Sequence, residues 1–381
     1  MDLKEIIGKR IKAEREKRGF SQGKLAEALG WNNHQTVVSV ESGQREVKAW
    51  ELAKIAKFLG VNLMDLLEES AGSQNLPFVL WRVEPKENKP EARAKFLKHC
   101  EDYYFLEKTL GFPNRISRQL PLLNVNLEEA NIEDVEEQAN YIRESFNLGH
   151  YPAVTLSKTL EDYYGIKFLQ FDFGSNAGSA ASTKSDFGVC ILVNKSEIPW
   201  RQNFSVAHEL FHLLTWDEKL FKNNEGNAEF NKHNETLANA FAAELLMPEE
   251  SILSEIRKIA PKKDCQFTDL VIIARKFDVS IKALLTRLES LKLIKTETKE
   301  QLLKEPDFKD LDQKSKLKDY CAAKRLGERF IRMAYQAYAR EKISRSRLAE
   351  MMDVPLGSLK RILEENGLPE SANREITLCH S

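Results

Sequence analysis

Two histidines and a glutamate stand in the spacing His-Glu-x-x-His, at His208, Glu209 and His212. Residues four apart on a helix lie about one turn apart on the same face, so both imidazoles can reach one ion. Zn²⁺ prefers nitrogen ligands at about 2.0–2.1 Å in a tetrahedral arrangement, and a helix fixes two of the four positions. Glu209 can then act as general base on the attacking water. The alternative is a chance match on a core helix, and a third ligand would favour the metal site.

The segment around these residues, 203–214, predicts a buried helix. We expect Asn203 to be its N-cap, and no Gly or Pro follows to break the helix. A buried helix with two histidines and a carboxylate needs partners for them, because an unpaired buried charge is costly. Its remaining positions are apolar nearly all round: Val206, Ala207, Leu210, Phe211, Leu213 and Leu214.

A second helical segment, 235–247, offers the third ligand. At 100° per residue, Glu235 lies on a face of small and apolar residues that also carries Asn239. Such a face permits close helix–helix approach. A carboxylate on it would be buried without a partner unless it bound a cation. We therefore predict Glu235 as the third zinc ligand, and Asn239, one turn on, as a residue that orients Glu235.

His233 is the competing third ligand, because histidine is also a good ligand for zinc. It lies in a polar, Asn-rich stretch, 222–234, which we expect to be a loop. A histidine in such a loop is more often solvated at the surface, so Glu235 is preferred.

Together the two segments resemble the ImmA/IrrE family of zinc metallopeptidases, over about 131–255. The resemblance implies a zincin-like domain with a gluzincin-type site, in which His208, His212 and Glu235 hold zinc. Known members of the family cleave repressor proteins in phage, mobile-element or stress-response circuits. The matching residues are Arg201, Phe204, Ser205, Ala207, His208, Glu209 and His212, then Glu235, Ala238, Asn239, Phe241, Ala242, Ala243, Leu245, Leu246, Met247 and Pro248.

The implied reaction is hydrolysis of a peptide bond. Glu209 takes a proton from the attacking water and passes it to the leaving amine, acting as base and then as acid. The oxyanion of the transition state needs a further donor. Arg201 is one option, and it is equally well a structural or helix-end charge.

The amino-terminal segment, 1–70, predicts a compact unit of five helices. Ser21 should cap the second helix, and Gly30 should supply the turn after it. A short third helix, about 34–41, follows, and a fourth runs from about 50 to 61. The residues expected to close the core are Leu63, Leu66 and Leu67.

This segment resembles the XRE-type helix-turn-helix family of DNA-binding domains over its whole length. The resemblance implies that the 34–41 helix enters the major groove of double-stranded DNA, and a two-fold dimer on a palindromic operator is expected of this class. The matching residues are Arg18, Gly19, Phe20, Ser21, Gln22, Leu25, Ala26, Leu29, Gly30, Glu41, Ser42, Gly43, Leu52, Ala53, Lys54, Ile55 and Ala56.

The predicted DNA contacts follow from this placement. Residues 1–57 carry 12 Lys/Arg against 8 Asp/Glu, a local excess of four positive charges. The alternative is a helical module used for dimerisation, with a solvated basic face. The polar side chains best placed for base edges are Gln35, Thr36 and Ser39. Those expected to hold phosphates are Gln22, Arg45 and Lys48.

The composition is that of a globular protein, with 381 residues, 42% hydrophobic and 30% charged, and a formal net charge of −1. This length allows two to four domains. No run approaches the roughly 20 apolar residues of a membrane span, and the start has no apolar signal core. The five cysteines are scattered singly, which argues against a disulfide framework or a cysteine-ligated metal. We therefore expect a protein of the reducing cytoplasm, without a membrane partner.

The expected fold class is mainly α with a small β-sheet (α+β). A connector, 71–130, begins as a linker and holds a helix over about 91–110. In the metallopeptidase-like domain, 131–255, helices over about 132–146 and 155–164 precede three strands. The last strand is a continuous apolar run, suited to a sheet with one face under the His-Glu-x-x-His helix. The expected strands are 166–171, 177–182 and 187–193.

The last region, 256–381, predicts further helices, and two of its stretches, 268–294 and 343–363, resemble the helix-turn-helix spacing of 21–40. Each could be an extra DNA reader or a plain structural unit of two packed helices. We favour the structural reading for the first, because the ImmA/IrrE resemblance includes a similar extension. The second stays open. The stretch 296–319 is charge-dense and predicts a linker or an exposed helix. The basic residues of the second stretch are Arg345, Arg347, Lys360 and Arg361.

Two functions are compatible with this sequence. The first is a regulator that binds operator DNA and cleaves a partner protein, a repressor, with a zinc endopeptidase domain. The second is a DNA-binding repressor or antitoxin whose peptidase-like domain senses a signal, with little or no proteolysis. Glu209 favours the first, because a pure binding module has no need of a general base.

Overall fold

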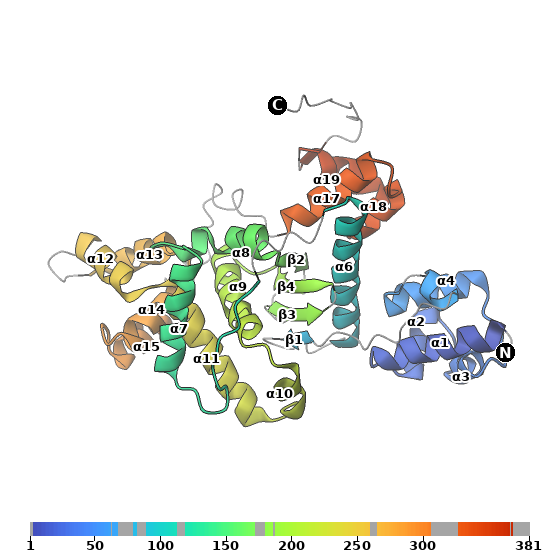
Figure 1. Cartoon of the computed structure of the whole chain (residues 1–381), viewed down its shortest axis with the longest axis horizontal. Coiled ribbons are helices and arrows are strands. Elements are labelled where there is room, and N and C mark those ends of the chain that lie inside the picture. The colour runs from blue at the N-terminus through green and yellow to red at the C-terminus, as the bar shows by residue number, and fades with distance from the viewer. Residues whose placement is uncertain are drawn as a thin grey trace. The chain divides into compact units, whose positions relative to one another are not determined.

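The computed structural model describes residues 3–61, 63–67, 79–81, 89–112, 119–171, 180–185, 187–259, 265–305, 327–365 and 367–368. These residues are mainly helical with one small sheet, which confirms the predicted fold class (Figure 1). The chain divides into two compact units, one made of residues 1–79 with 84–102 and the other of residues 80–83 with 103–381. None of the described helices is long and apolar enough to cross a membrane.

The first unit begins with the predicted helices. The Ser21 hydroxyl accepts a hydrogen bond from the Lys24 amide at 3.1 Å and caps the second helix, and Gly30 ends that helix in the left-handed conformation. Both roles agree with the sequence. The helices are α1 (Leu3–Lys17), α2 (Gln22–Leu29), α3 (Gln35–Glu41), α4 (Ala49–Leu59) and α5 (Leu63–Leu67).

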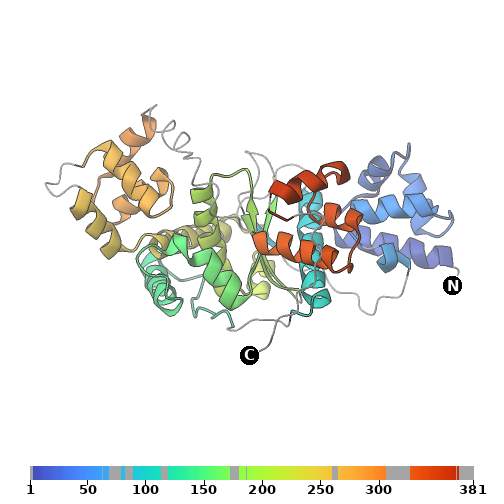
Figure 2. The ribbon, with the colours of Figure 1, turned by 90° about the horizontal axis from the view of Figure 1, so that it is seen from above.

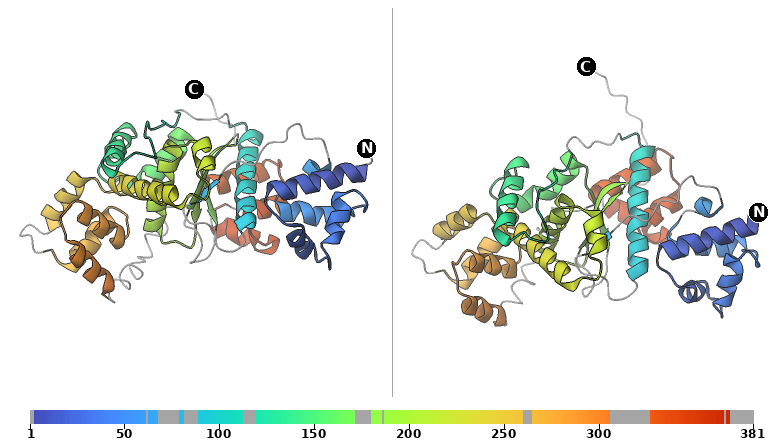
Figure 3. Two further views of the ribbon diagram at one scale, coloured as in Figure 1. Left: turned by 90° about the horizontal axis from the view of Figure 1, so that it is seen from below. Right: turned by 60° about the horizontal axis from the view of Figure 1, so that its bottom comes forward.

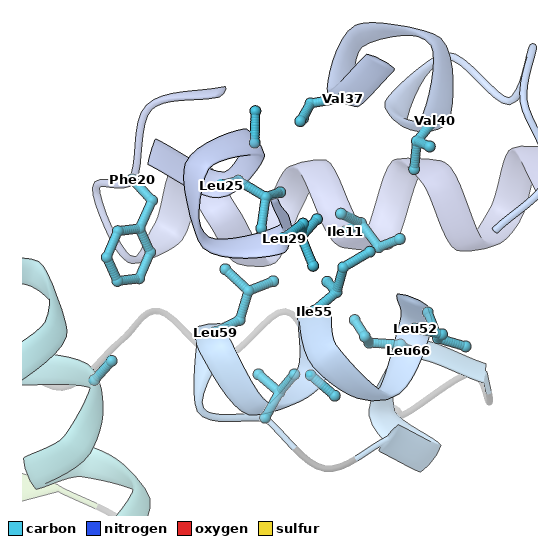
Figure 4. Close-up of a cluster of buried hydrophobic side chains, with 14 residues drawn as sticks. Ile11, Phe20, Leu25, Leu29, Val37, Val40, Leu52, Ile55, Leu59 and Leu66 are labelled. Atoms are coloured by element: carbon cyan, nitrogen blue, oxygen red, sulfur yellow. The ribbon is translucent and has the colours of Figure 1, made fainter. Parts of the chain in front are cut away.

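These helices close around one apolar core (Figure 4). Leu66 is fully buried in it and Leu67 is partly buried, as predicted, but the prediction for Leu63 is wrong because 37% of this residue is exposed. Leu63 is the first residue of α5, and helical side chains lean toward the N-terminus, so its side chain points past the helix end. The core includes Ile11, Phe20, Leu25, Leu29, Val37, Val40, Leu52, Ile55, Leu59 and Leu66.

Helices α1 and α3 are held together by a close crossing and a buried ion pair. A Cβ at Gly8 would lie 2.3 Å from the carbonyl oxygen of Val40, so only glycine permits this approach. Arg15 donates from Nε and Nη2 to the two carboxylate oxygens of Glu41, at 2.5 and 3.1 Å. Gln22 Nε2 donates to the same carboxylate at 2.8 Å. The position of α3 is therefore fixed by polar as well as apolar contacts.

The second unit contains a four-stranded sheet in the order β1-β3-β4-β2. β2 runs parallel to β4, whereas β3 pairs with β4 antiparallel. The three predicted strands are present, although residues 177–179 of the middle one lie outside the described residues. β1 was not predicted, because a three-residue apolar strip gives no periodicity to detect. The strands are β1 (Val79–Trp81), β2 (Lys167–Phe171), β3 (Ala180–Ser185) and β4 (Gly188–Asn194).

The His-Glu-x-x-His helix, α9 (Pro199–Leu214), packs against β3 and β4, as predicted. The prediction of Asn203 as its N-cap is wrong, because the helix begins at Pro199 after an extended Ile198. Proline suits the first helical position, where an N–H has no partner within the helix. Asn203 lies inside α9, where its side-chain amide donates to the carbonyl oxygen of Asp278 at 3.1 Å.

The helix that carries Glu235, α11 (Ala228–Leu246), begins earlier than the sequence indicated. The predicted loop over 222–234 is mostly helical, because α10 (Glu218–Asn223) covers its start and α11 covers its end. Asn227 caps α11 by accepting from the Phe230 amide at 3.2 Å. α11 packs against α9 and α7 (Ile132–Ser145), and this packing outweighs the low helix propensity of its asparagines.

Figures 2 and 3 show the remaining helices, of which α6 belongs to the first unit up to Asp102 and to the second unit from Tyr103. The predicted helix over 91–110 is α6, and its C-terminal half contacts α17 through the Tyr103 and Phe330 rings, whose centroids are 5.4 Å apart. The charge-dense stretch begins with α15, which buries no residue, and 306–319 lies outside the described residues. The remaining elements are α6 (Lys89–Thr109), α7 (Ile132–Ser145), η1 (Pro152–Val154), α8 (Leu156–Tyr164), α12 (Glu249–Ile259), α13 (Phe267–Lys276), α14 (Ile281–Ser290), α15 (Thr296–Lys304), α17 (Glu328–Ala339), α18 (Arg345–Met351), η2 (Leu356–Ser358) and α19 (Leu359–Glu365).

Both helix-turn-helix-like stretches fold as helix pairs with a tight turn. Asp278 lies between α13 and α14 with φ 56°, and Asp353 follows α18 with φ 54°. Aspartate tolerates this left-handed conformation better than most residues. Ser280 and Ser344 cap α14 and α18 by accepting backbone hydrogen bonds. In the second stretch the order matches that around α2, where Ser21 caps the helix and the left-handed Gly30 follows it. In the first stretch the left-handed residue precedes the capped helix, as Gly19 precedes Ser21 and α2.

Candidate metal centre

His208, His212 and Glu235 come together between α9 and α11, with one donor atom of each within 4.8 Å of the others. The two Nε2 atoms are 3.2 Å apart. The Glu235 carboxylate places Oε2 3.2 Å from His208 Nε2 and Oε1 3.4 Å from His212 Nε2. Tetrahedral zinc with bonds of about 2.0–2.1 Å requires roughly 3.3–3.4 Å between neighbouring ligand atoms. The residues therefore fit a zinc ion.

The packing of α9 explains how the histidines are held. Leu210, Phe211, Leu213 and Leu214 are fully buried on the other faces of α9, so the helix cannot rotate without exposing them. On α11, Ala238 and Ala242 are fully buried small residues, which allow the two helices to approach closely.

Burial differs sharply among the three potential ligands. His208 is completely buried and the side chain of His212 is 3% exposed, whereas the side chain of Glu235 is 34% exposed. Asn239, one turn further along α11, is also exposed. The cluster is therefore closed on the sheet side and open on the Glu235 side, where a substrate could reach it.

Asn239 contacts His208, whereas the sequence indicated that it would orient Glu235. Its Oδ1 lies 3.1 Å from His208 Nδ1. Because an amide oxygen only accepts, Nδ1 must carry the proton, and the Nε2 lone pair then faces the cluster. This is the tautomer that a metal-ligating histidine needs.

Asn234 lies beside His212 as Asn239 lies beside His208, and sequence reasoning missed it. Its buried side-chain amide lies 3.5 Å from His212 Nδ1. The oxygen of this amide is buried and has no hydrogen-bond partner among the residues that the structure describes. Exchanging the O and N positions of the amide would let this oxygen accept the Nδ1 proton. The only signal in the sequence was its position next to Glu235.

The charge state of Glu235 suits a cation. Burial by itself would raise the pKa of this carboxyl, but hydrogen bonds and charge interactions with His208 and His212 outweigh it and lower the pKa to about 2. Glu235 is therefore ionised at neutral pH and available as an anionic ligand.

Two other predicted residues lie along α9. Glu209 is fully buried next to His208. Arg201 is exposed and precedes His208 by seven residues, which places it about 10 Å away along the helix axis. This separation makes Arg201 better placed for a more distant part of a substrate than for an oxyanion at the metal.

His233, the competing ligand, does not belong to the cluster. It is half-buried within α11 instead of solvated in a loop, so the prediction of a surface loop histidine is wrong. Two residues before Glu235 on a helix, its side chain points about 200° away from the Glu235 face.

The residues predicted to contact DNA lie on and around α3. Gln35 and Lys48 are exposed, and Thr36 and Ser39 are half-buried. Two others are engaged inside the domain. Gln22 donates to Glu41, and Arg45 donates to Glu51 at 2.7 Å with its guanidinium 4.9 Å from the centroid of the Trp31 ring. All six remain predicted DNA contacts.

Comparison with known families now places both regions. Residues 161–289 match the IrrE N-terminal-like domain, and residues 11–66 match the helix-turn-helix family. The chain therefore combines an XRE-type helix-turn-helix domain with an IrrE-like, peptidase-like domain. Both resemblances inferred from the sequence are confirmed. A search of curated proteins gives no match.

Two solved structures share features with this chain at low identity. A Mycobacterium tuberculosis transcriptional regulator matches 49% of this chain over 51% of its own, with 14% identity and a TM-score of 0.31. The apo form of the competence regulator ComR from Streptococcus vestibularis matches 97% of this chain over 96% of its own, with 14% identity and a TM-score of 0.17. This chain thus spans about half the length of the mycobacterial regulator. TM-scores this low say nothing about the site.

Proposed function

We propose that this protein is a DNA-binding regulator with zinc-dependent endopeptidase activity, and that it cleaves a partner repressor in a phage, mobile-element or stress-response circuit. The observation that carries the proposal is the His208, His212 and Glu235 cluster, whose separations of 3.2–3.4 Å suit tetrahedral zinc. A buried Glu209 directly beside this cluster supports hydrolysis.

Three residues would bind the zinc ion, and a fourth would orient one of them. His208 and His212 hold the ion with neutral imidazoles, and Glu235 adds the anionic ligand from α11. Asn239 fixes the ring of His208 by accepting its Nδ1 proton. Bound zinc supplies a Lewis acid that polarises the scissile carbonyl and acidifies water near neutral pH.

Glu209 moves the proton. In α9 it is adjacent to His208 and fully buried, so its carboxylate is shielded from bulk water. It accepts a proton from the attacking water and then donates that proton to the nitrogen of the leaving amine. This second transfer completes peptide hydrolysis and restores the carboxylate.

The amino-terminal domain would bind the protein to its operator DNA. α3 would enter the major groove of operator DNA, with Gln35, Thr36 and Ser39 toward the base edges. Gln22, Arg45 and Lys48 would hold the phosphates on either side. Because the DNA-binding domain and the peptidase-like domain belong to one chain, a substrate that also binds DNA would be close to the peptidase. A repressor is such a substrate. We place the protein in the cytoplasm for the same reason.

The experiment compares full-length protein with its Glu209→Gln variant, both loaded with zinc and incubated with the repressor encoded beside the gene. We expect discrete cleavage by the first and a loss of about 10²–10⁴-fold in the second. Zinc stoichiometry and DNA affinity should be equal in both. Glu225→Gln, at an exposed position before α11, is the matched control and should cleave normally.

A different result would assign the other function. If Glu209→Gln binds zinc, binds DNA and regulates as well as the unaltered protein, the peptidase-like domain is a sensor and the proposal of proteolysis fails.

A further inference from the structure

A cavity of about 690 Å³ lies in the second unit between α7, α9, α11 and α14. This volume is within the range of ligand pockets in proteins and exceeds that of a single side chain. Small residues make the space: Ala240 and Ala243 on α11 and Ala283 on α14 line it. Phe204 and Ile132 add apolar walls.

The cavity continues the face that carries the metal ligands. On α9, Arg201 and Phe204 line the cavity and share a helix face with His208, at intervals of three and four residues. On α11, Asn239 also lines the cavity and contacts His208 directly. A polypeptide lying across the exposed side of Glu235 would therefore enter this cavity next.

The cavity is held open by a buried arginine. Arg287 on α14 donates to Glu136 on α7 at 2.7 Å and to the Met247 carbonyl oxygen at 3.3 Å, and it also pairs with Glu244 on α11. Only 3% of the Arg287 side chain is exposed. These contacts fix α14 at a set distance from α7 and α11, so the space does not depend on a ligand to form.

The cavity lining carries one more cation than carboxylates, with Arg201, Lys282 and Arg287 against Glu136 and Glu197. Glu136 accepts from Arg287 at 2.7 Å, whereas Glu197 accepts from the neutral Ser205 hydroxyl at 3.2 Å and keeps its negative charge. Arg201 and Lys282 are exposed, and neither forms an ion pair with any residue that the structure describes. An acidic group entering the cavity would thus find two cations that are not held in an ion pair with a described residue.

We propose that this cavity is a substrate subsite beside the metal centre, and that it takes a peptide segment with an acidic side chain whose carboxylate is bound by Arg201 and Lys282. The subsite rests on the proposed function for its use, because a peptidase needs a pocket that selects the residues near the cleaved bond. It adds a substrate class: segments with Asp or Glu near the cleaved bond.

The test measures binding, so that it does not depend on turnover. Full-length Glu209→Gln protein loaded with zinc is titrated into fluorescent octapeptide pools that are random except for one fixed Glu, Lys or Leu. We expect the Glu pool to bind about fivefold tighter than the Leu pool, the effect of an exposed ion pair. Arg201→Gln and Lys282→Gln should each remove most of this preference. The double reversal Arg201→Glu with Lys282→Glu should transfer it to the Lys pool.

The matched control is Lys219→Gln, which removes an exposed cation on α10 outside the cavity and should leave the Glu preference intact. Equal binding of all three pools, or a Glu preference that survives both Arg201→Gln and Lys282→Gln, overturns the subsite. The proposed function fails separately, through absence of cleavage by the unaltered protein. A cleaving enzyme without charge preference would therefore refute the subsite alone.

Discussion

The helix-turn-helix domain and the α9–α11 pair use buried polar groups in opposite ways. In the amino-terminal domain the buried charges satisfy one another, as Arg15 and Glu41 do, and the residues predicted to read DNA lie toward the surface. In the α9–α11 pair the residues proposed for chemistry are themselves buried, and His208 and Glu209 are fully inaccessible.

In the amino-terminal domain, the residues proposed for function are therefore different from those that stabilise the fold. In the α9–α11 pair, the same buried residues would serve both purposes. Substituting Gln35 removes no buried contact, so α3 can change the residues predicted to read DNA at little cost in stability. Substituting His208 disturbs a buried cluster that holds α9 and α11 together. We therefore expect the free energy of unfolding to respond to ligand and mutation very differently in the two regions.

Metal removal should have the largest effect, and it should be confined to α9 and α11. Zinc at about a ten-thousandfold excess over its dissociation constant adds roughly 5.5 kcal/mol to the stability of the state that binds it. Hydrogen exchange of the full chain, with zinc and with a chelator, measures this region by region. Amides of α9 and α11 should lose protection with the chelator, while those of α1 to α4 stay unchanged.

His208→Ala is the control for this prediction, since its hydrogen exchange should no longer respond to zinc. An equal response of α1 to α4 would contradict the comparison, because it would mean that the metal stabilises both regions.

Breaking the buried ion pair of the amino-terminal domain should come next. Arg15→Met leaves the Glu41 carboxylate buried without its guanidinium, which costs about 3–5 kcal/mol when a buried pair loses one partner. Loss of hydrogen-exchange protection in α1 to α4, with α9 and α11 unaffected, is the expected result. Lys12→Met changes an exposed cation of the same helix and should have little effect.

The double variant Arg15→Met with Glu41→Leu tests the cause. It should recover most of the lost stability, because no uncompensated charge remains. If the double variant is as unstable as Arg15→Met alone, then the packing of the Arg15 side chain, and not its charge, holds α1 against α3.

The part of the site that depends on spacing could be predicted from the sequence. His208 and His212 share a face of any helix through them, and Glu235 follows from its place on a face of small residues. The start of α9 could not be predicted by searching for a polar cap, because Pro199 begins the helix. Asn203 was assigned a local role, whereas its partner is the Asp278 carbonyl oxygen from a distant turn.

Features that depend on contacts distant in sequence were beyond prediction for the same reason. Asn234 supports His212 only because α11 crosses α9 at that point. The helical state of 228–234 comes from packing on α7 and α9, since asparagine favours loops and caps over helix interiors. The cavity likewise depends on Arg287, which is paired with Glu136 from another helix 151 residues away in sequence.

Substitutions of the α3 residues predicted to contact DNA should change the free energy of unfolding least. Gln35→Ala should alter it by less than about 0.5 kcal/mol, because the side chain is exposed, while a lost base contact weakens specific DNA binding by about 1–3 kcal/mol. Lys48→Ala should instead weaken binding to all sequences alike and lower the salt dependence by about one phosphate contact. Titration of DNA from upstream of the gene against a scrambled duplex at several salt concentrations separates the two effects. A fall in stability above 1 kcal/mol for Gln35→Ala would mean that α3 needs its reading residues to fold, and the contrast with α9 would then disappear.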